Sequence, residues 1–186
     1  MAKLIYFATM SLDAYVEDKE GNLDWGAPSE EESVFINSLV RPIGTYLFGR
    51  WMYETMAYWD TAVTLPEQPA ADAFAAIWRS ADKVVYSKTL ATVSGPGARI
   101  ERDFDARAVR KLKSSADRDI CIGGAQLAAT AIDAGLVDEY FLFVVPVMLG
   151  GGKRCLQNNA RVNLELLDER RFNSGRLYLR YGLRVD

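Results

Sequence analysis

The stretch ICIGGAQLA, residues 120–128, joins a short apolar run to two glycines and then to the start of a helical pattern. A strand that ends in bare glycines and leads directly into a helix presents free backbone N–H groups and a helix N-terminus at the carboxyl edge of a sheet. Such groups suit an anion. A tight turn that requires a positive φ explains Gly123 and Gly124 equally well. The chain contains neither a G-x-G-x-x-G fingerprint nor a P-loop.

Three further apolar runs, residues 4–8, 45–48 and 84–86, share the β-branched and aromatic character of residues 120–122. Such runs are typical of strands that are covered on both faces. Helical patterns lie between and after them. Their apolar positions are 35, 36, 39 and 40; 74, 77, 78 and 81; 108, 109, 112 and 116; and 127, 128, 131 and 132, before Gly135. This alternation predicts a largely parallel sheet between two layers of helices.

The last third of the chain departs from that alternation. Residues 140–147 form one long apolar strand pattern, and residues 162–171 lead to the turn signal Asn173-Ser174-Gly175. Strict alternation then follows at Leu177, Leu179, Tyr181, Leu183 and Val185. We predict an antiparallel hairpin at the sheet edge and loops at residues 60–70 and 94–97. The fold class is therefore α/β, a three-layer α/β/α domain over residues 1–186 with a mostly parallel mixed sheet.

Composition limits the available chemistry. Of 186 residues 49% are hydrophobic, and the net charge of −3 disfavours nucleic acid as a partner, because nucleic-acid binders carry a basic excess. No apolar run approaches the roughly 20 residues that span a bilayer, and no signal peptide is evident, so we expect a cytoplasmic protein without a membrane partner. The absence of histidine removes Ser-His-Asp and Cys-His catalysis and His-ligated zinc. Cys121 and Cys155 form no C-x-x-C pair, so we expect no metal.

Two other predicted strands end in cations. Gly49-Arg50 follows the second strand and Ser87-Lys88 follows the third. Ligands of open α/β sheets collect along the carboxyl ends of the strands, where a guanidinium and an ammonium group can hold a phosphate. A solvated surface charge explains either cation taken alone. The coincidence of three such strand ends favours a long phosphorylated ligand.

The chain also resembles a known superfamily. The segments that carry the resemblance are, in order, MSLDAYV (10–16) with GNLDW (21–25), LFGRWMYE (47–54), IGGA (122–125), and GLVDE (135–139) through PVMLGGGKR (146–154). They are similar to the dihydrofolate reductase-like superfamily. The branch they resemble most contains the reductase (RibD C-terminal) domain of bifunctional riboflavin-biosynthesis deaminase-reductases and its stand-alone relatives. The match runs nearly end to end, and the LGGGKR segment is fairly specific to that branch.

The resemblance implies a dihydrofolate reductase-like fold with NADPH lying across the carboxyl edge of the sheet. The cofactor-binding residues that it implies are Gly123, Gly124, Ala125 and Gln126 at the pyrophosphate; Gly49, Arg50, Ser87 and Lys88 toward the adenosine 2′-phosphate; and Thr9 and Val16 near the nicotinamide. In this family the Gly-Gly peptide is often cis, a form that a pair without Cβ atoms tolerates.

The chain departs from the family pattern at two positions. Ala14 stands where the family's Ser-Leu-Asp-Gly motif has glycine, which implies a stiffer or differently bent loop over the nicotinamide. Met52 stands where a threonine hydroxyl usually meets a phosphate. The loss of that hydrogen bond, worth about 1 to 3 kcal/mol, would weaken NADPH binding or alter the pose of the cofactor.

The proton donor has two candidates. In folate-reducing relatives an acid opens the first long helix about four residues before an aromatic residue that contacts substrate, which implies Glu31 and Phe35. However, Ser29 and Glu32 also form a capping box, and acids suit a helix N-terminus in any case. Asp13 lies in the motif beside the nicotinamide, where it either serves the substrate or fixes the loop by accepting backbone N–H bonds.

The pattern as a whole predicts an NADPH-dependent reductase of a small heterocyclic substrate. Trp25 either walls the substrate pocket or covers the core. By resemblance the activity is like that of 5-amino-6-(5-phosphoribosylamino)uracil reductase. The alternatives are dihydrofolate reduction and a non-catalytic dinucleotide-binding or sensor protein. The deaminase half is not expected, because its zinc signature begins with histidine. Apolar sheet edges predict a homodimer.

Overall fold

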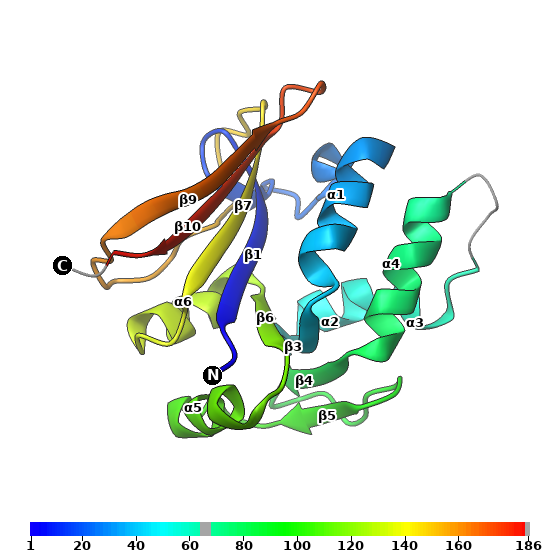
Figure 1. Cartoon of the computed structure of the whole chain (residues 1–186), viewed down its shortest axis with the longest axis vertical. Helices are drawn as coiled ribbons and strands as arrows, with labels where there is room; N and C mark the ends of the chain where they lie inside the picture. Colours follow the sequence, from blue (N-terminus) through cyan, green and yellow to red (C-terminus); the bar gives the residue numbers. More distant parts are fainter. Residues whose placement is uncertain (64–67, 185–186) are drawn as a thin grey trace.

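A sheet of eight strands runs through the computed structural model, which describes residues 1–63 and 68–184, in the order β5-β4-β3-β6-β1-β7-β10-β9. The strands are β1 (Leu4–Ser11), β3 (Ile43–Gly49), β4 (Asp82–Tyr86), β5 (Ala98–Glu101), β6 (Asp119–Gly123), β7 (Glu139–Val145), β9 (Leu164–Arg171) and β10 (Leu177–Leu183). Neighbours from β5 to β7 are parallel, whereas β10 is antiparallel to both β7 and β9. The predicted mixed sheet with a C-terminal hairpin is confirmed (Figure 1).

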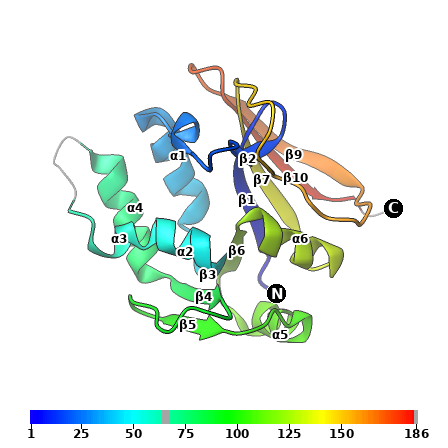
Figure 2. The same ribbon diagram turned by 180° about the vertical axis from the view of Figure 1, so that it is seen from behind.

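Helices cover both faces of this sheet. The helices α1 (Glu30–Val40), α2 (Arg50–Met56), α3 (Tyr58–Thr61) and α4 (Pro69–Ser80) lie on one face, and α5 (Ala106–Ser115) and α6 (Ala125–Asp133) lie on the other (Figures 1 and 2). A short 3-10 helix, η1 (Asp24–Gly26), precedes α1. Within the described residues, no helix has the length and apolar character that crossing a membrane requires.

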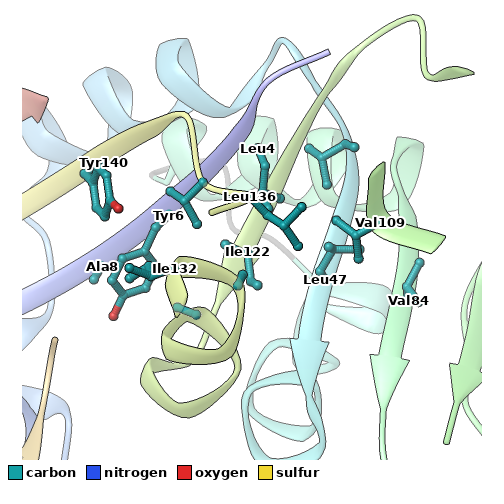
Figure 3. Packing of buried hydrophobic residues seen from close by; sticks show 14 of the residues in the cluster. Leu4, Tyr6, Ala8, Leu47, Val84, Val109, Ile122, Ile132, Leu136 and Tyr140 are labelled. Atoms are coloured by element: carbon teal, nitrogen blue, oxygen red, sulfur yellow. The ribbon is translucent and has the colours of Figure 1, made fainter. Parts of the chain in front are cut away.

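Each face of the sheet has its own apolar core. Leu4, Tyr6 and Ala8 of β1 point toward α5 and α6, where they pack with Leu47, Ile122 and Ile132 (Figure 3). The alternate β1 residue Ile5 points the other way, toward Trp78 of α4, which is fully buried. Burial of a large apolar side chain stabilises a fold by roughly 1.5 to 3 kcal/mol, so these two layers hold the sheet edge in place.

The helix starts follow local sequence signals. Ser29 caps α1: its Oγ accepts a hydrogen bond from the Glu32 backbone N–H, and the Glu32 side chain accepts one from the Ser29 N–H. This is the capping box that the sequence predicts. Asp105 caps α5 in a simpler way, and Pro69 occupies the first turn of α4, where its missing N–H costs nothing.

The predicted loop at residues 60–70 is wrong at both ends. Helix α3 continues to Thr61, and α4 begins at Pro69; residues 64–67 lie outside the described part of the chain. Tertiary contacts hold α3, because Trp78 Nε1 donates to Asp60 Oδ1 at 2.7 Å. The loop at residues 94–97 is confirmed, whereas the hairpin strand ends at Leu183 and the predicted continuation to Val185 lies outside the described residues.

Register brings three strand ends together at one edge of the sheet. Phe48 of β3 pairs with Gly123 of β6, and Gly49 pairs with Tyr86 of β4. A second, two-stranded sheet that the sequence does not predict joins β2 (Tyr15–Glu17) to β8 (Lys153–Arg154) in antiparallel fashion. This small sheet brings a segment from early in the chain next to one that lies late in the chain.

Candidate functional site

A cavity of about 1210 Å³ opens at the carboxyl edge of the sheet and extends over the face that carries α1 and α4. We divide it into two compartments. The edge compartment is formed by residues 49–52 and 123–127 together with Glu17 and Lys153. The inner compartment lies between the sheet and α1, α3 and α4, and its wall includes Phe7, Ile36, Phe48, Met56, Trp59 and Phe74. A volume of this size accommodates a ligand larger than a single small molecule.

The glycine pair forms the floor of the edge compartment. A Cβ atom at Gly123 would approach Phe48 Cε1 to 2.5 Å, so the bare α-carbon is required by packing. Gly124 has φ +89° and precedes α6, whose first residues Ala125 and Gln126 also line the cavity. The structure is therefore compatible with both interpretations of the glycine pair. The turn requires glycine, and the N-terminus of α6 faces the cavity, where it can bind an anion.

The peptide between Gly123 and Gly124 is trans, which corrects the cis form implied by the resemblance. The positive φ of Gly124 turns the chain from β6 into α6, and so the trans peptide suffices for the turn. Met52 lies beside the pair, with its Cγ 3.6 Å from the position of a Gly123 Cβ. A thioether, rather than a hydroxyl, faces the glycines here.

Arg50 lines the cavity and brings a positive charge to it. Its Nε donates to Glu54 Oε1 at 2.8 Å, and its Nη1 donates to Thr89 Oγ1 at 3.2 Å. Half of the side chain is exposed, so the pair with Glu54 is a weak surface ion pair that a ligand phosphate can compete with. Gly49 lines the cavity next to it.

Ser87 and Lys88 lie outside the cavity lining. Ser87 Oγ accepts hydrogen bonds from the N–H groups of Thr89 and Leu90, which makes it a turn residue. Lys88 pairs with Asp103 at 3.3 Å on the exposed surface. Their cofactor-binding role, implied by the resemblance, has no geometric support, because β4 ends at Tyr86 and it is the Tyr86 side chain that lines the cavity.

Lys153 is a lining residue that the sequence analysis does not single out. Its Nζ lies 2.7 Å from Glu17 Oε1 and 5.4 Å from the centre of the Trp51 ring. The pairing of β8 with β2 brings it there, and Gly152 before it passes so close to the Glu17 carbonyl that any Cβ atom would overlap that oxygen. The run of three glycines before this lysine was the available signal.

Thr9 and Val16 both line the cavity, as the resemblance implies. Thr9 lies in the second half of β1, and its Cγ2 would lie 3.3 Å from a Cβ at Gly26. Trp25 also lines the cavity, and its Nε1 donates to the Asn22 carbonyl at 3.0 Å. The loop over the cavity mouth thus presents an indole to it.

Asp13 fixes a loop instead of facing the cavity. Its Oδ1 accepts from Ser11 Oγ at 2.6 Å and from the Leu149 N–H at 3.1 Å, and its Oδ2 accepts from the Gly150 N–H at 2.8 Å. These bonds, led by the one from Ser11, lower the pKa of Asp13 to about 2. A carboxyl group with that pKa holds no proton at neutral pH, so the geometry agrees with the loop-fixing alternative.

The three acids that open α1 have separate partners. Glu31 pairs with Arg170 at 2.9 Å on the hairpin side, outside the cavity lining. Glu32 is the capping-box acid and is buried against Arg176. Glu30 lines the cavity, and its Oε1 accepts from the Ala70 N–H at 3.3 Å. Of these three acids, the one that lines the cavity is therefore Glu30, one residue before Glu31.

Phe35 lies beneath the cavity wall and not on it. Its ring packs against Phe172, Tyr178 and Phe143, with centroid distances of 5.4, 5.0 and 6.3 Å. The next residue, Ile36, lines the inner compartment in its place. Adjacent residues of a helix point in different directions, so an error of one residue in the predicted contact position changes which side chain faces the cavity.

Comparison with known proteins agrees with this architecture. The chain is 32% identical to the Bacillus subtilis protein YyaP over 186 residues, which covers 96% of this chain and 94% of YyaP. In fold it is similar to a diaminohydroxyphosphoribosylaminopyrimidine deaminase/5-amino-6-(5-phosphoribosylamino)uracil reductase from Thermotoga maritima, with TM-score 0.69, 11% identity, and coverage of 98% of this chain and 57% of that one. It is also similar in fold to a dihydrofolate reductase from Enterococcus faecalis complexed with NADP(H), with TM-score 0.66, 14% identity, and coverage of 98% and 97%.

The family model described as the RibD C-terminal domain matches residues 2–178. That match spans nearly every element that builds the cavity, from β1 through the beginning of β10. The chain belongs to the RibD C-terminal domain family, with the dihydrofolate reductase-like fold.

Proposed function

We propose that this protein is an NADPH-dependent reductase of a small heterocyclic or carbonyl substrate. One observation carries the proposal: the ends of β3, β4 and β6 meet at a single cavity whose edge compartment continues into an aromatic inner compartment. A dinucleotide along the edge and a planar acceptor in the inner compartment would meet in one continuous space. Membership of the RibD C-terminal domain family and the NADP(H) complex of the Enterococcus relative support this assignment.

The residues of the edge compartment fit the cofactor. The bare Gly123 and Gly124 at the start of α6 allow a pyrophosphate close to backbone N–H groups. Arg50 and Lys153 bring positive charge to the same compartment. Thr9 and Val16 also line the cavity, and we propose that they flank the nicotinamide.

Reduction requires both a hydride and a proton. When bound, the reduced nicotinamide supplies the hydride to the carbon of a C=N or C=O bond. The heteroatom then needs a proton, and Glu30 is the acid that lines the inner compartment, whereas Asp13 and Glu31 are engaged elsewhere. We propose that Glu30, directly or through a water, hands over that proton.

Arg50 provides the test of the cofactor. We expect the Arg50→Gln variant to bind NADPH about tenfold more weakly, because it loses a charge-assisted hydrogen bond to the 2′-phosphate. Affinity for NADH, which lacks that phosphate, should not change. Binding is measured by quenching of tryptophan fluorescence. Lys88→Gln, a charge deleted on the surface beside Asp103, is the matched control and should bind NADPH normally. Equal losses for NADPH and NADH would contradict the role of Arg50.

Glu30 provides the test of turnover. In a screen of heterocyclic and carbonyl compounds that follows NADPH absorbance, we expect Glu30→Gln to lower kcat at least tenfold and to leave NADPH affinity unchanged, because only the proton source is lost. Glu31→Gln is the matched control from the same helix turn. An unchanged kcat in Glu30→Gln would show that the proton comes from another group.

A non-catalytic dinucleotide sensor is the second candidate. The observation that favours it is that Asp13 and Glu31 are both bound by neighbouring groups, while Met52 places a thioether beside the glycines. A sensor would bind NADPH and oxidise it with none of the acceptors. Turnover with any acceptor excludes the sensor.

A further inference from the structure

The charges that line the cavity are distributed unevenly between its compartments. Among the described lining residues, the positive charges are Arg50 and Lys153, and both belong to the edge compartment. Glu54 and Glu17, the ion-pair partners of Arg50 and Lys153, also line the cavity. The remaining charged lining residue is Glu30, which lies in the inner compartment. Residues 64–67, which lie outside the described part of the chain, contain no lysine or arginine. The inner compartment therefore has negative character and no cation of its own.

Two arginines near the inner compartment have partners that hold them away from it. Lys83 is fully buried and has no hydrogen-bond partner among the described residues, but it lies over the Trp78 ring and does not line the cavity. Arg176 is buried against Glu32 and donates to the carbonyls of Gly26 and Ala27. Arg79 donates to the Asp60 and Ala62 carbonyls. An anion in the inner compartment would have to draw one of these side chains out of its contacts. Burial of an unpaired anion is strongly unfavourable, and Glu30 would add repulsion.

The wall of the inner compartment suits a flat apolar molecule. The large apolar side chains of this wall pack against the hydrophobic core between the sheet and α1 and α4, yet they are only partly buried. They line the cavity, and they are Phe7, Ile36, Met56, Trp59 and Phe74. Of its polar groups, Asn37 already donates from Nδ2 to the Ala70 carbonyl at 2.8 Å. Aromatic walls with few polar groups bind planar ligands by stacking and burial.

We infer that the substrate is a planar conjugated carbonyl or imine compound that carries no phosphate or carboxylate group. This inference rests on the proposed function and restricts it, because it excludes a phosphoribosyl substrate of the kind named for the Thermotoga relative. In the reaction, hydride adds to the carbon of the C=O or C=N bond and a proton adds to its heteroatom. NADPH is oxidised to NADP⁺, so atoms and electrons balance.

Two fluorescent probes that differ by one anionic group test the charge preference. N-phenyl-1-naphthylamine is neutral, and 8-anilinonaphthalene-1-sulfonate has the same rings and a sulfonate. We expect the full-length protein to bind the neutral probe at least tenfold more tightly in a fluorescence titration. Ribose 5-phosphate should not displace the neutral probe. Equal or tighter binding of the sulfonate, or displacement by the sugar phosphate, would overturn the inference.

Three variants test whether the neutral probe binds in the inner compartment and whether the charge of that compartment sets the preference. Ser33 lines the cavity, whereas Val34, the next residue of α1, is 57% exposed on the outer side. Ser33→Arg should abolish the preference for the neutral probe, and Val34→Arg should leave it intact. Ala71→Trp should fill the compartment and weaken the neutral probe at least tenfold. If Ala71→Trp has no effect, the compartment does not take a neutral ring and the inference fails. Should the arginine variants not fold, the wild-type comparison of the two probes still decides.

The NADPH titration separates this inference from the proposed function. If NADPH binds and the sulfonate probe is preferred, the substrate class is wrong and the reductase proposal survives. If the neutral probe is preferred and NADPH does not bind, the inner compartment is as inferred and the cofactor assignment falls.

Discussion

Ala14 is an alanine held in a backbone conformation that normally selects glycine. Its φ is +66°, and its carbonyl accepts from the Cys155 N–H at 2.9 Å while its own N–H donates to the Ser11 carbonyl at 2.9 Å. The hydrogen bonds at both ends fix the turn after β1. The substitution that sets this chain apart from the family motif therefore leaves the turn in place and stores strain in it, because left-handed alanine costs roughly 1 kcal/mol.

Replacing Ala14 by glycine should relieve that strain. We expect Ala14→Gly to raise the free energy of unfolding by about 0.5 to 1 kcal/mol, the strain relief being partly offset by the greater freedom of glycine in the unfolded chain. Urea denaturation measures it. Ala108→Gly, at an exposed position inside α5, should lower stability by about 1 kcal/mol. Destabilisation by both changes would mean that residue 14 carries no strain.

At the scale of elements, a buried ion pair joins α1, the η1 loop and the hairpin. Arg176 Nη1 lies 3.3 Å from Glu32 Oε2, with both side chains buried. Ser174 Oγ also donates to Glu32. Burial alone would raise the pKa of Glu32, but the hydrogen bonds from Ser174 and the Ser29 N–H and the charge of Arg176 together lower it. Because Arg176 also holds the Gly26 and Ala27 carbonyls, this joint sets the position of Trp25 at the cavity mouth.

Removing one partner of the Arg176–Glu32 ion pair should lower the stability of the protein. We expect Arg176→Met to lower the free energy of unfolding by about 3 to 5 kcal/mol, because it leaves a buried carboxylate without its charge partner. The double variant Glu32→Gln with Arg176→Met should recover part of that loss. Chemical denaturation of the two single variants and the double variant gives the coupling energy. Additive losses would show that the two residues act independently.

The elements that sequence patterns predict well are those whose signals are local. Apolar periodicity and the Ser29 cap are such signals, and the long strands and α1 follow from them. The short β2 and β8 pair has almost no pattern of its own, because two or three residues cannot show a period. Lys153 reaches the cavity through that pair, and the three glycines before it are the one local signal of its position. The neighbours Glu30 and Glu31 lie on different sides of the first turn of α1. The spacing from Phe35 alone does not show which of the two faces the cavity.

On the scale of the whole molecule, β9 is an outer strand of the sheet, and its free edge is uncovered (Figure 1). β9 pairs with β10 on one side only, and Leu166, Leu177 and Leu183 are 48%, 40% and 39% exposed. An uncovered strand edge with apolar side chains is usually covered by another chain. The homodimer expected from the sequence stays our proposal, with this hairpin as its interface.

Charge placed on the apolar side of β9 should disrupt such a dimer. We expect wild-type protein to show twice the chain mass of 20.8 kDa in light scattering and Leu166→Lys to show the single mass. The neighbouring Leu167 lies over Gly182 on the other side of the strand, so Leu167→Lys should keep the dimer. A wild-type protein that runs as a monomer at micromolar concentration would exclude this interface.

The contact between Phe48 and the bare α-carbon of Gly123 has a consequence for how the two compartments communicate. The Phe48 ring lines the cavity and contacts the glycine that we propose binds the cofactor, so one side chain adjoins both proposed ligand positions. A ligand that displaces this ring would also shift the surface offered to the second ligand. Because thermodynamic linkage is reciprocal, any factor by which the cofactor changes the affinity for the acceptor equals the factor by which the acceptor changes the affinity for the cofactor.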